Sequence, residues 1–343
     1  MRLAIDVMGG DDAPGAVLKG CVEALDLLAD TDRLVLVGPE SLINDHLAEL
    51  SAPSSKIEIE HAPDVIAMHD APAASVRTMR NSSIVRMAKL ASRKAENPCD
   101  AAFSAGNTGA CVSAGIMHMK RLPGVHRPGI AVTIPAFHGP VILCDAGANP
   151  EPKPNHLWQY AVMADVVARD TLKIDAPRVA LMNIGAEESK GSELVKKAAD
   201  LIKATPDINY IGFVEGRDFF AGAADVVITD GFTGNTILKT AEGLAKSLFQ
   251  ALATEIFEHD PNLALQFEPI VKSIYAKNDY HEHGGAPLLG VNGVMTIGHG
   301  SSKPRSIKSA IRNTRDYVAH GVNDAIAQRL AEVAEIERQR EHA

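Results

Sequence analysis

Short apolar runs alternate with longer amphipathic segments along most of the 343-residue chain. A short apolar run next to Gly, Asp or Pro is typical of a strand, and apolar residues at every third or fourth position are typical of a helix. The predicted strands are residues 3–5, 34–37, 56–60, 101–103, 130–134, 140–144, 179–181 and 226–228. The predicted helices are residues 16–28, 109–120, 155–168, 235–257 and 316–340. This alternation predicts an α/β fold in which helices cover both faces of a mostly parallel sheet.

The helical pattern of residues 235–257 is the strongest in the chain, and His259-Asp-Pro261 ends it. A second apolar segment follows over residues 263–274. We interpret residues 237–275 as a candidate helical hairpin within one domain, 1–343. The segment packs on the sheet, or it protrudes to form a dimer interface or to touch a membrane; the sequence leaves these alternatives open.

Glycine-rich segments interrupt the pattern at residues 6–14, 104–110, 183–191, 229–236 and 283–290. The first four follow predicted strands. Glycine permits positive φ and close backbone approach, so the amides of such turns can surround an anion at a helix N-terminus. Because open α/β sheets bind ligands at the carboxyl ends of their strands, these turns predict one crevice in a phosphate-handling enzyme.

Composition narrows the class of protein. Hydrophobic residues make up 46% of the chain and charged residues 22%, which is typical of a globular protein. The net charge of −9 argues against a nucleic-acid binder, although a local basic patch could still receive an acidic protein. We expect a cytoplasmic protein, because no apolar run reaches the ~18 residues of a membrane span and the N-terminus does not resemble a signal peptide.

The cysteines and histidines do not suggest a metal site. Cys21, Cys99, Cys111 and Cys144 are far apart, so we expect reduced, buried thiols. Cys111 could be a nucleophile in principle, but a small buried thiol is the favoured interpretation. The His281-Glu-His283 run lacks further ligands.

Two of the glycine-rich segments carry candidate cations and amides. Residues 183–191 place Glu187 and Lys190 on a loop or first helical turn, where Lys190 could neutralise phosphate or an oxyanion. The alternative is a solvated helix start. In the segment 229–236, Asn235 is either a helix N-cap or an oxyanion donor, and Lys239 follows one turn later.

Two further polar groups follow apolar runs. Asp145 and Asn149 face the crevice, or they form a tight turn and helix cap. His299, Gly300 and Ser301 could orient phosphate or supply a general acid, or they could form a simple turn. The chain has no Gly-x-Ser-x-Gly nucleophile elbow, no Walker phosphate loop and no dinucleotide-binding glycine motif after its first strand.

Taken together, these segments resemble the bacterial phosphate acyltransferases of phospholipid synthesis over nearly the whole chain. The most specific motifs are Ser104-Ala-Gly-Asn-Thr-Gly109, Asn183-Ile-Gly-x-Glu-Glu-x-Lys-Gly191, Thr229-Asp-Gly-Phe-Thr-Gly-Asn235 and Gly284-Gly-Ala-Pro-Leu-Leu-Gly290. Val7 and Ala186 stand where the family pattern suggests alanine and glutamate, and neither change removes a group that the chemistry needs.

The resemblance implies that orthophosphate attacks the thioester of a long-chain acyl-acyl carrier protein, giving acyl phosphate and free carrier protein reversibly. It also implies an α/β/α sandwich similar to phosphate acetyltransferases and isocitrate dehydrogenase-like enzymes, a homodimer, and no metal or organic cofactor. The acyl phosphate would pass to a membrane glycerol-3-phosphate acyltransferase, which makes peripheral attachment to the inner face of the cell membrane an expectation.

Carried onto this chain, the resemblance places Lys190 and Asn235 at the catalytic centre, one on the phosphate and the other on the carbonyl oxygen. Glycine amides near Gly9, Gly106, Gly231 and Gly300 would hold the phosphate. The remaining expected substrate contacts are Asp6, Gly10, Asn107, Thr108, Asp145, Asn149, Glu187, Asp230, Thr233, Lys239, His299 and Ser301.

Two other functions stay open at this stage. A short-chain enzyme that uses acyl-coenzyme A would need the same crevice, and a non-catalytic membrane scaffold would not need the retained motifs. An acidic carrier protein could dock on a set of basic residues that could equally be solvated charges: Arg121, Arg127, Lys303, Arg305, Lys308 and Arg312.

Overall fold

The computed structural model describes residues 1–52, 54–136, 138–278 and 284–341. Its strands form one eleven-stranded sheet in the order β3-β2-β1-β4-β11-β10-β5-β6-β9-β7-β8. The strands are β1 (Arg2–Asp6), β2 (Arg33–Gly38), β3 (Ile57–His61), β4 (Ala101–Ser104), β5 (Gly129–Ala136), β6 (Gly139–Cys144), β7 (Arg178–Met182), β8 (Asn209–Val214), β9 (Val226–Ile228), β10 (Ala286–Leu289) and β11 (Val294–Ile297).

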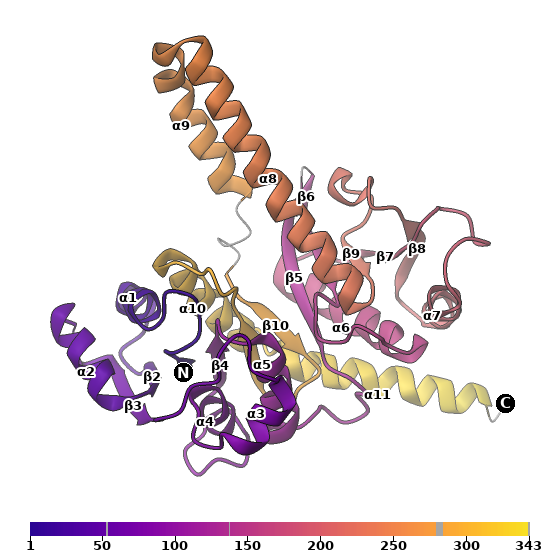
Figure 1. Cartoon of the computed structure of the whole chain (residues 1–343). Helices are drawn as coiled ribbons and strands as arrows, with labels where there is room; N and C mark the ends of the chain where they lie inside the picture. The colour runs from indigo at the N-terminus through magenta and orange to yellow at the C-terminus, as the bar shows by residue number, and fades with distance from the viewer. Residues whose placement is uncertain (53, 137, 279–283, 342–343) are drawn as a thin grey trace.

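Helices cover both faces of this sheet (Figure 1). They are α1 (Gly15–Glu23), α2 (Glu40–Glu49), α3 (Pro72–Thr78), α4 (Ser83–Leu90), α5 (Thr108–Ala114), α6 (Pro154–Leu172), α7 (Glu193–Ala204), α8 (Gly231–His259), α9 (Pro261–Asn278), α10 (Pro304–Ala319) and α11 (Val322–Glu341). Short turns of 3₁₀ or π helix complete the chain: Leu25–Leu27, Ser54–Lys56, Gly115–Met119 and Phe219–Ala221.

The sheet consists of two parallel blocks joined by an antiparallel centre. Strands β1, β2, β3, β4 and β11 pair in parallel, and so do β6, β7, β8 and β9. Between the blocks, β10 pairs antiparallel with β11 and β5, and β5 pairs antiparallel with β6. The predicted α/β class with a mostly parallel sheet is confirmed.

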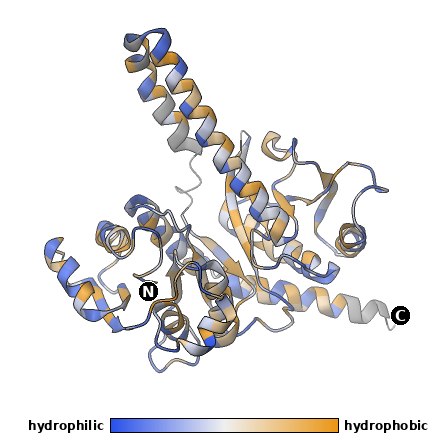
Figure 2. Cartoon of the chain, in the orientation of Figure 1, coloured by the Kyte–Doolittle hydropathy of each residue, from blue (hydrophilic) through white to orange (hydrophobic). Residues whose placement is uncertain are grey.

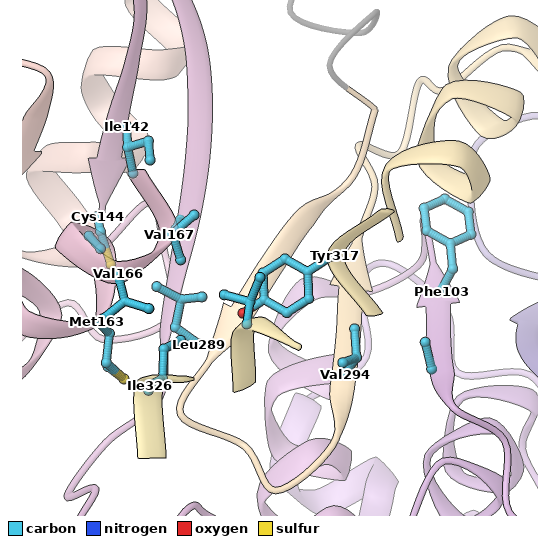
Figure 3. Packing of buried hydrophobic residues seen from close by; sticks show 14 of the residues in the cluster. Phe103, Ile142, Cys144, Met163, Val166, Val167, Leu289, Val294, Tyr317 and Ile326 are labelled. Carbon is cyan, nitrogen blue, oxygen red and sulfur yellow. The ribbon is translucent and has the colours of Figure 1, made fainter. Parts of the chain in front are cut away.

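One hydrophobic cluster runs through both blocks. It includes Phe103 on β4, Leu289 on β10 and Cys144 on β6, together with Tyr317 on α10 (Figure 3). Helix α6 is buried over most of its length because it packs between the sheet and helices α7 and α11. Most of its buried residues are apolar, as such a position requires, and the buried Asp165 carboxylate accepts from the Arg169 guanidinium at 2.7 Å.

Helices α8 and α9 pack against each other and project from the body as a hairpin (Figure 1). Within α8 only Gly231 and Gly234 are buried. Figure 2 shows apolar residues along the projecting part, and the exposed ones are Leu244, Leu248, Leu252, Phe257, Leu265, Phe267, Ile270 and Ile274. The segment therefore packs on the core at its start, through Ile237 and Leu238, and its longer remaining part projects from the body.

Two predicted elements differ from the structure. The glycine-rich segment 283–290 is not simply a turn, since β10 occupies its centre; His281 and His283 lie outside the described residues. Pro287 and the flanking glycines argue against a strand in the centre of a sheet. Strand β10 tolerates these residues because only a few of its residues pair with β11 on one side and with β5 on the other. The predicted helix 316–340 is two helices, because the chain turns at Gly321, whose φ is +64°.

Candidate active site

A cleft of about 430 Å³ lies where the two parallel blocks meet. The loops after β1 and β11 contribute Asp11 and His299 to its lining, and the start of α5, which follows β4, contributes Thr108. The other block contributes Gly147 from the loop after β6, and Asn235 from the helix after β9. Residues from four of the five glycine-rich segments thus reach one cleft, and the segment 183–191 supplies none of the described lining residues.

Helix α8 presents one stripe to the cleft. Asn235, Leu238, Lys239 and Glu242 all line it, and their spacing of three, four and seven residues places them on the same helix face. The helix begins at Gly231 and its N-cap is Asp230, whose carboxylate accepts bonds from the backbone N–H (2.8 Å) and hydroxyl (2.7 Å) of Thr233. The N-cap alternative for Asn235 is therefore wrong, and its side chain is free to face the cleft.

The start of α8 is held against the turn after β6 by glycines. A Cβ on Gly234 would lie 2.0 Å from the backbone oxygen of Asp145, and one on Gly231 would lie 2.8 Å from that residue's Oδ2. The Gly231 amide also donates to the Asn149 carbonyl at 2.8 Å. This close approach fixes where Asn235 and Lys239 stand.

Lys239 and His299 meet across the cleft. The Lys239 Nζ is in hydrogen-bond contact with His299 Nε2 and lies 3.4 Å from the Glu242 carboxylate. On the other side of the ring, His299 Nδ1 accepts from the Ser301 backbone N–H at 3.3 Å and lies 2.7 Å from the Ser301 hydroxyl. An ammonium and an imidazole placed together form a site that suits an oxyanion such as phosphate.

Much of the rest of the lining is apolar. It includes Phe103, Ile130, Val132, Leu238 and Ile297, which belong to the hydrophobic core or pack against it. The cleft therefore combines a cationic group with an apolar wall, an arrangement able to take a molecule with both an anionic and a hydrocarbon part.

The glycine-rich turns after β1 and β4 contact each other. A Cβ on Gly9 would lie 2.6 Å from the Gly106 amide nitrogen, and Gly10, with φ +121°, packs beside Gly300. Asp6 is buried beneath them and accepts bonds from the Ser104 hydroxyl (2.7 Å) and the Met8 amide (3.0 Å). Burial raises the pKa of the Asp6 carboxyl. These groups hold the turns together, and of the five residues here that belong to the expected site only Gly300 lines the cleft.

Asn107 is likewise used by the fold. It is the N-cap of α5, accepting from the Ala110 amide at 3.0 Å, and its side-chain amide donates to the carbonyls of Ala67, Met68 and Asp70. The neighbouring Thr108 lines the cleft.

Asp145 and Asn149 form a buried turn. The Asp145 carboxylate accepts bonds from the amides of Ile130, Gly147, Ala148 and Asn149 at 2.6–3.1 Å. Burial raises its pKa, and these donors oppose the shift. Asn149 donates to the Pro128 carbonyl and to the Tyr160 hydroxyl. The alternative that these two residues form a tight turn is confirmed. The helix cap that it included is wrong, because the next helix along the chain, α6, begins only at Pro154.

Lys190 and Glu187 lie on an exposed loop between β7 and α7, whose N-cap is Ser192. The Asn183 side chain braces the loop by donating to the carbonyls of Gly185 (3.1 Å) and Lys190 (3.3 Å). Since β7 pairs with β9, this loop and the start of α8 emerge from neighbouring strands. Lys190 is outside the cleft lining in this structure.

The four cysteines are buried and free, as predicted. Burial raises the pKa of Cys111 to about 12, which disfavours a nucleophilic thiolate. Among the described residues, no group of three or more His, Cys, Asp or Glu side chains could hold a metal ion. No described helix is long and apolar enough to cross a membrane.

Sequence reasoning missed several polar residues of the cleft, including Asp11, Thr133, Glu242 and Ser306. Glu242 could have been found, because it lies seven residues after Asn235 on a predicted helix. Thr133 gave no local signal: it lies on β5, which reaches the cleft through antiparallel pairing in the centre of the sheet.

Comparison with known proteins defines the class of this molecule. Residues 1–325 match the family model described as "Fatty acid synthesis protein". The chain is 41% identical over 338 residues to the phosphate acyltransferase of Dictyoglomus thermophilum, covering 98% of this chain and 99% of the relative. It is 40% identical over 335 residues to the phosphate acyltransferase of Bacillus subtilis, covering 97% and 98%.

The chain therefore belongs to the fatty acid synthesis protein family, which includes these phosphate acyltransferases, and it is an enzyme of the acyltransferase class. The family inferred from the glycine-rich motifs is confirmed.

Solved structures support the fold. A phosphotransacetylase from Streptococcus pyogenes superposes with a TM-score of 0.61 at 16% identity, covering 93% of this chain and 94% of that one. A 4-hydroxythreonine-4-phosphate dehydrogenase from Klebsiella pneumoniae gives 0.51 at 12% identity, covering 92% and 99%. The expected likeness to phosphate acetyltransferase and dehydrogenase folds is confirmed at the level of fold.

Proposed function

We propose that this enzyme transfers the acyl group of a long-chain acyl-acyl carrier protein to orthophosphate. A phosphate oxygen attacks the thioester carbonyl, the C–S bond breaks, and the thiolate of the carrier protein leaves and takes up a proton. The observation that carries this proposal is the cleft itself, where the Lys239–His299 pair stands beside apolar lining in a chain of the phosphate acyltransferase family.

In this reaction the protein mainly holds orthophosphate beside the thioester carbonyl, because phosphate already supplies nucleophilic oxygens. Lys239 and His299 would bind the phosphate, and the Asn235 amide, one turn before Lys239, would donate to the carbonyl oxygen as negative charge develops there. Lys190 is proposed as a further cation that approaches from the neighbouring loop, and the apolar lining would take the start of the acyl chain.

The test is cleavage of palmitoyl-acyl carrier protein with and without orthophosphate, following acyl phosphate by mass spectrometry. Phosphate-dependent formation of palmitoyl phosphate is expected. Product from acetyl-coenzyme A but none from the carrier protein would favour a short-chain enzyme, and no product from either donor would favour a scaffold. Lys190→Ala and Lys239→Ala, compared in this assay, separate the two lysines: wild-type turnover by a folded Lys190→Ala enzyme would remove Lys190 from the mechanism.

We also propose that the projecting hairpin of α8 and α9 makes contact with a second copy of the chain or with the inner face of the cell membrane, near the acyltransferase that uses the acyl phosphate. Its support is the row of exposed apolar residues, among which Leu244 is 66% and Leu265 is 68% exposed. A variant with Leu244→Asp and Leu248→Asp, compared with wild type by ultracentrifugation and vesicle flotation, should lose self-association or vesicle binding. Retention of both properties would refute this role.

A further inference from the structure

A group of cations gathers on the surface beside α3 and α4. Arg77, Arg80 and Lys120 are exposed, and Arg86 and Lys89 are half-buried. Short contacts link them: the Lys89 Nζ donates to the Arg80 carbonyl at 3.1 Å, and the Arg80 Nε donates to the Arg77 carbonyl at 3.4 Å. We refer to these five residues as the α3–α4 basic surface.

The cations lie close enough to act on one another. Burial and the nearby Arg86 and Arg80 guanidinium groups lower the pKa of Lys89. His118, on the π turn that follows α5, also has a lowered pKa because of burial and of Lys89 and Lys120. The surface is therefore a locally positive region on a chain whose net charge is −9.

Few carboxylates balance this charge. Of the five cations, only Arg86 has a carboxylate within ion-pair distance among the described residues, Glu60 at 3.4 Å. The Arg86 Nε and the His118 Nε2 are buried and have no hydrogen-bond partner in the described part of the chain. Like charges held together without counter-charges cost stability, which an acidic partner would offset.

Two of the basic residues singled out from the sequence are already paired with carboxylates. Lys303 is in contact with the Asp12 carboxylate, and Lys308 lies 2.8 Å from the Asp26 carboxylate. The α3–α4 basic surface thus offers more unpaired charge than Lys303 and Lys308 do.

The α3–α4 basic surface lies one short helix away from the cleft. Met68 lines the cleft, and Asn107 fixes the loop around it by bonding to its carbonyl at 3.2 Å. Helix α3 starts immediately after this loop, where Pro72 packs beside Gly109 of α5, and leads to Arg77. The seven residues of α3 span about 10 Å. A partner bound at Arg77 would therefore need to extend a group over about that distance to reach the cleft.

From this geometry we propose that the α3–α4 basic surface is the docking site of the acidic carrier protein, whose acyl-bearing arm then enters the cleft past Met68. The proposal rests on the proposed function, because it takes the acyl donor to be a carrier protein. The carboxylates of the partner would pair with Arg77, Arg80 and Lys89, while the thioester is held by the cleft.

The test variant is Arg77→Glu with Arg80→Glu, and its matched control is Lys19→Glu with Lys197→Glu. The control changes the net charge by the same amount on two exposed helix positions, in α1 and α7. Binding of palmitoyl-acyl carrier protein is followed by fluorescence anisotropy at low and high salt. Initial rates are compared for this donor and for palmitoyl-pantetheine, which has no protein part.

The test variant is expected to bind the carrier protein about 10-fold or more weakly at low salt, with a matching rise in KM and a smaller difference at high salt. Turnover of palmitoyl-pantetheine and thermal unfolding should match wild type. The milder pair Arg77→Gln and Arg80→Gln should give a smaller loss in the same direction.

If the test variant bound the carrier protein as tightly as wild type, or if the control variant lost as much binding, the docking proposal would be overturned. The proposed acyl transfer to phosphate would not be affected by either result. Loss of binding to phosphatidylglycerol vesicles with unchanged carrier binding would reassign the surface to the membrane. Surface-dependent carrier binding without acyl phosphate formation by the wild type would support docking and refute the proposed reaction.

Discussion

The contact between Gly234 and the turn after β6 should be decisive for both stability and activity. A Cβ at this position would lie 2.0 Å from the backbone oxygen of Asp145, and backbone atoms cannot swing away as a flexible side chain can. Since ordinary contacts are about 3.5 Å, Gly234→Ala must move helix and turn apart by about 1.5 Å.

We expect Gly234→Ala to lower the free energy of unfolding by about 1–3 kcal/mol, the usual cost of overpacking a close contact. The displaced helix also carries Asn235 and Lys239 away from the position opposite His299. A misplacement of about 1 Å can cost on the order of 100-fold in rate, so turnover should fall by about that factor.

Urea unfolding followed by circular dichroism, together with the phosphate-dependent thioester assay, measures the two effects. The control is Gly243→Ala on the same helix, where an added Cβ meets no atom within 4 Å. It should stabilise the protein by up to about 1 kcal/mol, because alanine is the better helix former, and leave turnover unchanged. Wild-type stability and turnover in Gly234→Ala would show that this contact does not position the site.

Three further predictions concern single groups. Asn235→Ala should lower turnover about 100- to 1000-fold with little change in the melting temperature, as expected for loss of an oxyanion donor, and steady-state kinetics would check it. Burial alone would raise the pKa of Asp225, but its bonds from the Arg178 guanidinium and amide lower it, so this carboxylate stabilises the fold above the ordinary aspartate pKa and ceases to do so as the pH falls. Asp225→Asn should therefore cost about 1–2 kcal/mol at pH 7, and in urea titrations the difference from wild type should shrink as the pH falls through the lowered pKa of this carboxyl. The thiols should react with an aromatic disulfide reagent at pH 8 only after unfolding, since all four are buried; prompt reaction in the native state would contradict this packing.

The class of fold could be predicted because its signals are local. The strands around residues 3–5, 101–103 and 226–228 are short buried runs with a glycine three or four residues after each, and the structure places a strand at each. The elements that escaped prediction depend on distant partners. Strand β10 contains a proline and is a strand only because β5 and β11 lie on either side of it, and the edge strand β8 exposes Ile211 where an apolar residue suggests burial.

The glycine-rich motifs indicated where the cleft would be more reliably than which groups would face it. Asp6, Asn107, Asp145 and Asn149 use their polar atoms within the turns that carry them. Asn235, the last residue of its motif, does line the cleft, and Lys239 and Glu242 follow it through the three- and four-residue spacing of α8, while His299 lies across the antiparallel centre. In a tight turn, buried backbone N–H groups need acceptors, and polar side chains of the turn supply them. Those side chains are then not available to bind a ligand. In this chain most of the motif residues therefore build the support, and the amphipathic helix that starts in one of the motifs supplies Asn235 and Lys239 as the candidate chemistry.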